Sequence, residues 1–171
     1  MTKIMAKILS VIAPNGYQDI EYNDSKQALE SKGHIVITAS TVNEAHGKFG
    51  GKKKADILLS EVKPKDYDAI LFVGGPGSHD YFDDPLAHKL AKEFLNTKKL
   101  TTAICAAPSI LANAGLLKGI EATCFPGQIA NIKSKGAIYT GKSVQKDGLI
   151  ITADGPDSAT EFGEKIAEAL V

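Results

Sequence analysis

The sequence contains no tryptophan and only two cysteines among its 171 residues. Cys105 and Cys124 do not have the paired spacing of metal-binding motifs, and so few cysteines exclude a disulfide scaffold. Sparse cysteine of this kind is typical of proteins in a reducing compartment. We therefore expect a cytoplasmic protein that holds no metal.

The sequence also lacks a net charge and long apolar runs. Its 20 basic and 20 acidic residues cancel and its pI is near 6.9, so no overall field attracts nucleic acid or an anionic membrane. No apolar run approaches the length of a membrane span, and the N-terminal residues lack the long apolar region of a signal peptide. Neither nucleic acid nor a membrane is an expected partner.

The length and the hydrophobic content predict a single domain over residues 1–171. With 43% hydrophobic residues, a chain of this length suffices for one well-packed core and is short for two.

Strand-type and helix-type apolar patterns alternate along the chain, and Asp19 is the predicted N-cap of the first helix. This alternation, with glycines at strand ends, predicts a three-layer α/β/α sandwich around a mostly parallel sheet. The predicted strands cover residues 6–13, 34–39, 68–73, 100–104, 121–125, 137–140, 143–146 and 149–152, with a hairpin at 48–52. The predicted helices cover residues 19–33, 85–95 and 156–170, and a further helix follows Cys105 and ends near Gly115.

Cys105 lies at a predicted strand-to-helix elbow. Residues 100–104 have the pattern of a buried strand, and the apolar spacing becomes helical after Cys105, with Pro108 suited to a first helical turn. A side chain at such a turn projects over the carboxyl edge of the sheet. The N–H groups of a helix N-terminus favour anions, so we expect a reactive thiol with a lowered pKa. The alternative from the residues alone is a buried cysteine that acts as a small hydrophobe.

Ligand sites in such sheets form outside the carboxyl ends of the strands. The elbow, residues 14–21 after the first strand and the loop Gly74-Gly75-Pro76-Gly77 after the third are therefore expected to converge. Glycines in that loop let the backbone approach a ligand closely. A nucleotide site there is a weaker alternative, because a third glycine is missing and Pro76 lacks an N–H donor.

Four motifs are spread along the chain: Asp19-Ile20-Glu21, Gly74-Gly75-Pro76-Gly77, Ala103-Ile104-Cys105-Ala106-Ala107-Pro108 and Thr152-Ala153-Asp154-Gly155-Pro156. Together they resemble the ThiJ/PfpI superfamily, which includes the parkinsonism-associated protein deglycase and bacterial intracellular-protease-like proteins. The resemblance runs nearly end to end and implies a flavodoxin-like fold similar to class I glutamine amidotransferases.

The resemblance also implies roles for individual residues. Cys105 matches the reactive cysteine of the family, and Glu21 matches the glutamic acid that hydrogen-bonds it. The N–H groups of Gly75 and Ala106 match the oxyanion hole. No cofactor is implied, and a homodimer is the default expectation. From the residues alone, Glu21 would be a carboxylate in the first turn of a helix with only a small effect on stability.

The sequence departs from the family where a histidine is expected. Ala106 replaces the histidine that follows the cysteine in the protease-like branch, and Phe125 replaces the histidine of the deglycase branch. A cysteine–histidine pair is therefore missing from both positions, and we do not expect a peptidase. None of the four histidines, His34, His46, His79 and His88, has motif support. His79 is the one expected near the pocket, which Gly74 and Phe125 are also expected to line.

Two classes of function remain open. The first is an enzyme of the glyoxalase or protein deglycase type, in which the Cys105 thiolate attacks a small reactive carbonyl compound or a glycated substrate and Glu21 transfers a proton. The second is a redox-sensing or chaperone-like protein of the oxidative stress response, in which Cys105 oxidises without turnover.

Overall fold

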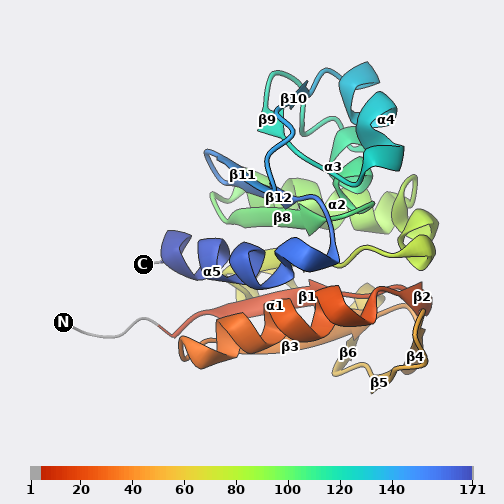
Figure 1. Cartoon of the computed structure of the whole chain (residues 1–171). Coiled ribbons are helices and arrows are strands. Elements are labelled where there is room, and N and C mark those ends of the chain that lie inside the picture. The colour runs from red at the N-terminus through yellow and green to blue at the C-terminus, as the bar shows by residue number, and fades with distance from the viewer. Residues whose placement is uncertain (1–4, 171) are drawn as a thin grey trace.

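The computed structural model describes residues 5–170, which form a seven-stranded sheet flanked by helices (Figure 1). Every pair of neighbouring strands in this sheet is parallel except the edge pair β11–β12. The strand order is β11 (Val144–Asp147), β12 (Ile150–Ala153), β8 (Leu100–Ile104), β7 (Ala69–Phe72), β1 (Lys7–Val11), β3 (Ile35–Ser40) and β6 (Ile57–Leu58).

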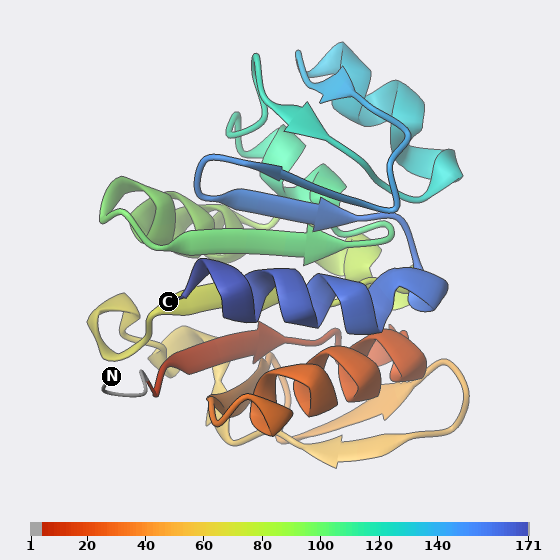
Figure 2. The same ribbon diagram turned by 60° about the vertical axis from the view of Figure 1, so that its left-hand side comes forward.

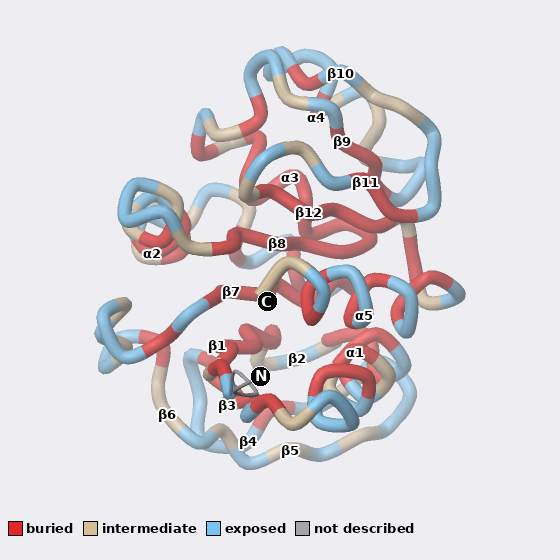
Figure 3. The backbone as a smooth tube through the Cα atoms, turned by 90° about the vertical axis from the view of Figure 1, so that its left-hand side faces the viewer, coloured by how far each residue is buried: buried red, intermediate tan, exposed pale blue. Residues whose placement is uncertain are grey.

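Helices cover both faces of the sheet, as the view along the strands shows (Figure 3). Helices α1 (Asp19–Ser31) and α5 (Ala159–Ala169) pack against each other on one face. Helices α2 (Pro85–Asn96) and α3 (Pro108–Asn113) lie on the other. The predicted three-layer sandwich with a mostly parallel sheet is therefore confirmed. Among residues 5–170, no helix is long and apolar enough to cross a membrane.

The central strands are buried on both faces, which explains their continuous apolar sequences. All residues of β7 and β8 are buried, as are Phe94 of α2 and Phe162 of α5 in the layers around them. Parallel strands covered by helices on both sides have this pattern because neither face meets water. The core thus fixes the strand ends on which the functional loops begin.

Several short elements lie outside the central sheet. The predicted hairpin is present as β4 (Glu44–Gly47) and β5 (Lys52–Lys54), and β2 (Asn15–Tyr17) pairs with β4. The strand predicted at 121–125 is shorter, because Pro126 starts a 3-10 turn after Phe125. The remaining short elements are β9 (Glu121–Ala122), β10 (Ile138–Tyr139), α4 (Ile129–Ser134), and the 3-10 helices η1 (Leu59–Glu61), η2 (Pro64–Asp66), η3 (Pro76–Tyr81), η4 (Pro126–Gln128) and η5 (Pro156–Ser158).

The N-cap of α1 is Gln18, which corrects the prediction of Asp19. The Gln18 side chain accepts a 2.9 Å hydrogen bond from the N–H of Glu21. Asp19 instead accepts hydrogen bonds from the N–H groups of Phe49 (2.7 Å) and Gly51 (2.9 Å) in the β4–β5 turn. Both of its carboxylate oxygens are occupied in this way, so Asp19 ties the hairpin to the first turn of α1.

Candidate active site

The candidate site lies where the parallel strands end. Figure 2 shows the arrowheads of these strands on one side of the molecule, the side on which α1 begins. A cavity of about 290 Å³ opens there. It is lined by Gln18, Lys48, Gly75, Pro76, His79, Cys105, Ala106, Phe125, Gln128 and Pro156. The structure therefore brings the three predicted loop regions together around one pocket.

Cys105 sits on a strained elbow directly after β8. Its φ is 65°, in the left-handed region that residues with a side chain seldom adopt. Two backbone hydrogen bonds of 2.8 Å hold it there: its N–H donates to Ala153, and its carbonyl accepts from the N–H of Phe125. The side chain is only 7% exposed. The surrounding strands thus impose a conformation that presents the thiol to the pocket from a buried position.

Glu21 lies beneath the pocket and is fully buried. The N–H of Gly74 donates a 2.9 Å hydrogen bond to its Oε1, while its Oε2 makes no hydrogen bond to any described residue. A Cβ added at Gly74 would lie 2.6 Å from that oxygen and 2.7 Å from the Cys105 Cβ. Only glycine at position 74 therefore leaves room for the carboxyl and the thiol to meet.

Burial dominates the electrostatics of this pair. It raises the pKa of Glu21 to about 7. The interactions with Cys105 and Gly74 and the charge of Lys48 lower this pKa, but burial has the larger effect. Burial also raises the pKa of the Cys105 thiol, and the Glu21 carboxylate raises it further. The lowered thiol pKa expected from the elbow is thus wrong while Glu21 is ionised. Because α3 begins only at Pro108, its N-terminus does not outweigh the loss of water around the sulfur.

Two negative charges cannot share this buried site at neutral pH, so once the pair loses its first proton, near pH 7, it holds one proton and one charge. A thiolate at Cys105 forms when its proton moves to Glu21. The N–H groups of Gly75 and Ala106 both hydrogen-bond the sulfur and lower the pKa of the thiol. These two donors can also stabilise a negative oxygen on a carbon bonded to that sulfur.

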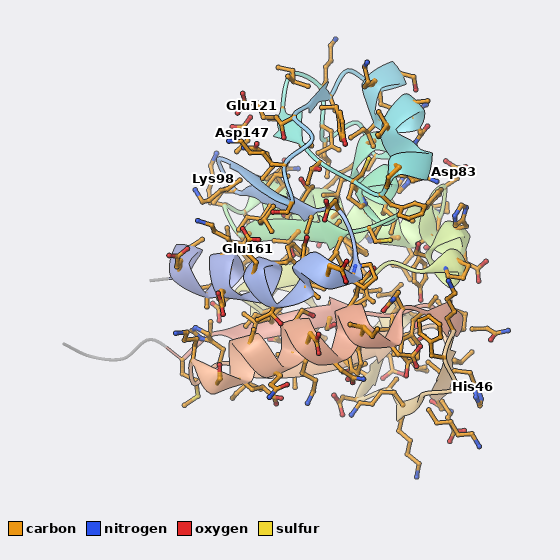
Figure 4. All side chains as sticks on the ribbon, in the orientation of Figure 1. His46, Asp83, Lys98, Glu121, Asp147 and Glu161 are labelled. Carbon is orange, nitrogen blue, oxygen red and sulfur yellow. The ribbon has the colours of Figure 1, made fainter. Side chains whose placement is uncertain are left out.

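The structure separates the four histidines. His79 lines the pocket, with its ring stacked on Phe82 at 4.2 Å between centroids. His34 and His88 use ring nitrogens in hydrogen bonds to backbone groups. His46 belongs to β4 and is exposed at the outer edge of the molecule (Figure 4). Of the four, His79 alone can reach a molecule in the pocket.

Sequence reasoning missed Gln18, Lys48 and Gln128 as lining residues. Nothing in the spacing of the hairpin lysines identifies the one that lines the pocket. Cys124 is fully buried outside the lining, and burial raises its pKa to about 12. Within residues 5–170, no cluster of three or more His, Cys, Asp or Glu side chains is placed to hold a metal ion.

Comparisons with known proteins show which family and which solved structures this chain is similar to. The model of the DJ-1/PfpI family matches residues 6–169. An uncharacterized protein of Methanocaldococcus jannaschii is 40% identical over 96% of this chain and 82% of its own. A ThiJ/PfpI domain protein from Brachyspira murdochii is 35% identical, with a TM-score of 0.95 over 97% of this chain and 96% of its own. An oxidized DJ-1 of Toxoplasma gondii is 28% identical, with a TM-score of 0.84 over 96% and 95%.

Proposed function

The chain belongs to the DJ-1/PfpI family, and from this membership we propose that it is a cysteine-dependent enzyme that acts on reactive carbonyl compounds. The observation that carries the proposal is the burial of Cys105 and Glu21 side by side, where a Cβ added at Gly74 would meet both side chains, next to the N–H groups of Gly75 and Ala106. Such a pair supplies a nucleophile and a proton carrier at the same carbon atom.

The reaction begins with a 2-oxoaldehyde in the pocket. The Cys105 sulfur forms a bond to the aldehyde carbon, and the electron pair of the C=O bond moves to oxygen, where the N–H groups of Gly75 and Ala106 stabilise it. Protonation of this oxygen by Glu21 gives a hemithioacetal and leaves Glu21 as a carboxylate. The reacting groups are therefore ready for a second proton transfer.

The second stage moves a proton between neighbouring carbons. The Glu21 carboxylate removes the C–H proton of the hemithioacetal, and a proton returns to the adjacent keto carbon through the enediol. The product is a 2-hydroxyacyl thioester on Cys105. Water then cleaves the C–S bond, which releases a 2-hydroxy acid and restores the thiol. The net reaction adds one water to the 2-oxoaldehyde and needs no oxidant or reductant.

A second candidate function is redox sensing, and the two N–H donors at the sulfur favour it. They would stabilise a sulfinate at Cys105 formed by two equivalents of peroxide, with the Glu21 carboxyl as a further donor. The oxidized DJ-1 of Toxoplasma gondii has the same fold, which supports this alternative. In this case Cys105 would be modified and no carbonyl compound turned over.

The deciding experiment measures the conversion of methylglyoxal to lactate. We expect slow turnover by the wild type, none by Cys105→Ala, and an unchanged rate for Cys124→Ala, whose side chain lies outside the pocket. If the wild type has no activity and peroxide converts Cys105 readily to the sulfinate, the redox function replaces the enzymatic one.

A further inference from the structure

We propose that the pocket in front of Cys105 recognises a carboxylate on the same small molecule that carries the reactive carbonyl. The inference deepens the proposed function and rests on it for the reaction, but the recognition itself can be tested separately. It follows from the orientation of the polar groups that line the cavity, which present hydrogen-bond donors and a positive charge to a bound molecule.

The Gln18 amide can present only its nitrogen to a ligand. Its Oε1 is occupied by the N–H of Glu21 at 2.9 Å, which fixes the orientation of the amide. Its Nε2 makes no hydrogen bond to any residue in the described part of the chain, 5–170. Since Gln18 lines the cavity, its NH₂ group is a donor available to a bound molecule.

The amide of Gln128, a second lining residue, is oriented in the same way as that of Gln18. Its Oε1 accepts a 2.6 Å hydrogen bond from the hydroxyl of Ser109. That hydroxyl in turn accepts a 3.0 Å hydrogen bond from Nδ2 of Asn131, so its own proton is committed to Gln128. Among the described residues, no partner occupies Nε2 of Gln128. The lining therefore contains a second amide with its donor side open.

Lys48 supplies the positive charge. It lines the cavity at the β4–β5 turn, and the hydrogen bonds from Phe49 and Gly51 to Asp19 hold this turn against α1. Its charge is near enough to lower the pKa of Glu21. Among the described residues Lys48 forms no salt bridge and no aspartate or glutamate belongs to the lining; its Nζ lies 5.3 Å from the centroid of the Phe49 ring.

A carboxylate fits these groups better than a neutral carbonyl compound does. Methylglyoxal has a methyl group where the pocket offers an ammonium and two NH₂ groups, whereas a carboxylate accepts charge-assisted hydrogen bonds from all three groups. The volume of about 290 Å³ suits a small metabolite. The substrate class is therefore a 2-oxoaldehyde whose other end is a carboxylate, for which 4,5-dioxopentanoate is a suitable probe.

The first test needs no turnover. Iodoacetate and iodoacetamide alkylate a thiol at the same carbon but differ in carrying a carboxylate or a neutral amide. We expect the rate with iodoacetate divided by the rate with iodoacetamide to be about three- to tenfold higher at Cys105 than at the thiol of glutathione. Two variants should remove this preference. Lys48→Met removes the charge, and Gln128→Glu keeps the acceptor for Ser109 but replaces the donor.

The matched control is Lys54→Met, on the same hairpin but outside the lining. It should keep the wild-type preference for iodoacetate. A wild-type ratio equal to that of glutathione, or a preference that Lys48→Met and Lys54→Met reduce equally, overturns the inference.

The second test compares kcat/KM for 4,5-dioxopentanoate with kcat/KM for methylglyoxal. We expect a ratio above one in the wild type that falls about three- to tenfold in Lys48→Met. Failure to turn over either compound, together with a Lys48-dependent preference for iodoacetate, would refute the proposed enzyme and leave the carboxylate site standing. Equal kcat/KM for both compounds with no preference for iodoacetate would refute the site and leave the enzyme.

Discussion

The N–H of Gly74 donates a 2.9 Å hydrogen bond to Oε1 of Glu21, and this bond sets the direction of the buried carboxyl group. The other oxygen, Oε2, makes no hydrogen bond to any described residue, and the carboxyl group interacts electrostatically with the Cys105 thiol. The candidate chemistry therefore depends on a backbone group in the loop after β7 as much as on the two side chains.

The first prediction is that Cys105 and Glu21 titrate as a pair. Alkylation of wild-type Cys105 by iodoacetamide should rise near pH 7, where the pair loses its first proton, and again at much higher pH, where it loses the second. Glu21→Gln should show one rise, at lower pH than the second wild-type step, because the charge that raises the thiol pKa is gone. Peptide mapping separates Cys105 from Cys124. Identical pH profiles for both proteins would rule out the coupling.

The second prediction concerns stability. Burial raises the pKa of Glu21 from 4.5 to about 7, so between these values the native state holds a proton that the unfolded state has lost. The free energy of unfolding therefore falls by about 3 kcal/mol in total as the pH rises from about 4.5 to about 7. Above pH 7 this contribution levels off. Urea unfolding at pH 5 and pH 8 measures this decrease.

Glu21→Gln is the control for that measurement, because its amide keeps the shape of the side chain and an acceptor for the Gly74 N–H. Its free energy of unfolding should lack this part of the pH dependence. A difference between wild type and variant that stays constant from pH 5 to pH 8 would show that Glu21 has an ordinary pKa.

The third prediction is that Gly74→Ala disrupts the site. The new Cβ would lie 2.6 Å from both Oε1 of Glu21 and the carbonyl oxygen of Ile104, so buried backbone must move. We expect a loss of about 1–3 kcal/mol in the free energy of unfolding and a slower alkylation of Cys105 at pH 7. Gly155→Ala is the control, because a Cβ there meets no atom within 4 Å. Equal stabilities of the two variants would contradict the close packing at Gly74.

The sequence predicts the sheet well because its central strands are buried on both faces. Continuous apolar runs such as 69–72 and 100–104 leave little ambiguity, and the elbow at Cys105 follows from the change of apolar period. Placement of the site then follows from a parallel sheet, whose strand ends share one edge. These features depend on local pattern and on a general rule of topology, so a single sequence reveals them.

Other features depend on contacts between distant segments and have no local signal. Gln18 caps α1 because Asp19 is engaged by a hairpin 30 residues further along the chain. The pocket contacts of Lys48 and Gln128 arise in the same way. The direction of the Cys105 pKa was mispredicted because an elbow indicates nearby N–H groups, whereas the removal of water is a property of the whole fold.

The fourth prediction tests the link between Asp19 and the hairpin. Asp19→Ala removes the acceptor of the Phe49 and Gly51 N–H groups, which should cost about 1–3 kcal/mol of unfolding free energy and speed the hydrogen exchange of both amides. The preference of Cys105 for iodoacetate should also fall, because Lys48 is no longer held at the pocket. Asp24→Ala on the same helix is the control. Unchanged exchange at both amides would show that the hairpin is held by other contacts.

The last prediction is that the protein does not hydrolyse peptides. Cleavage of an amide requires protonation of a poor amine leaving group, a task for a positioned acid such as histidinium. Ala106 and Phe125 occupy the two positions where relatives of this kind were expected to carry that residue, and the structure brings no histidine other than His79 to the pocket.

Addition of a thiolate to an aldehyde has no leaving group, so the Glu21 carboxyl can handle the proton transfers of a carbonyl substrate alone. We therefore expect no casein hydrolysis, while His79→Ala lowers methylglyoxal turnover far less than the ~10²–10⁴-fold typical for the loss of a general acid or base. Glu21→Leu, by contrast, should lose activity on that larger scale. Casein cleavage that requires both Cys105 and His79 would show instead that the histidine stacked on Phe82 swings into the pocket and serves as the missing acid.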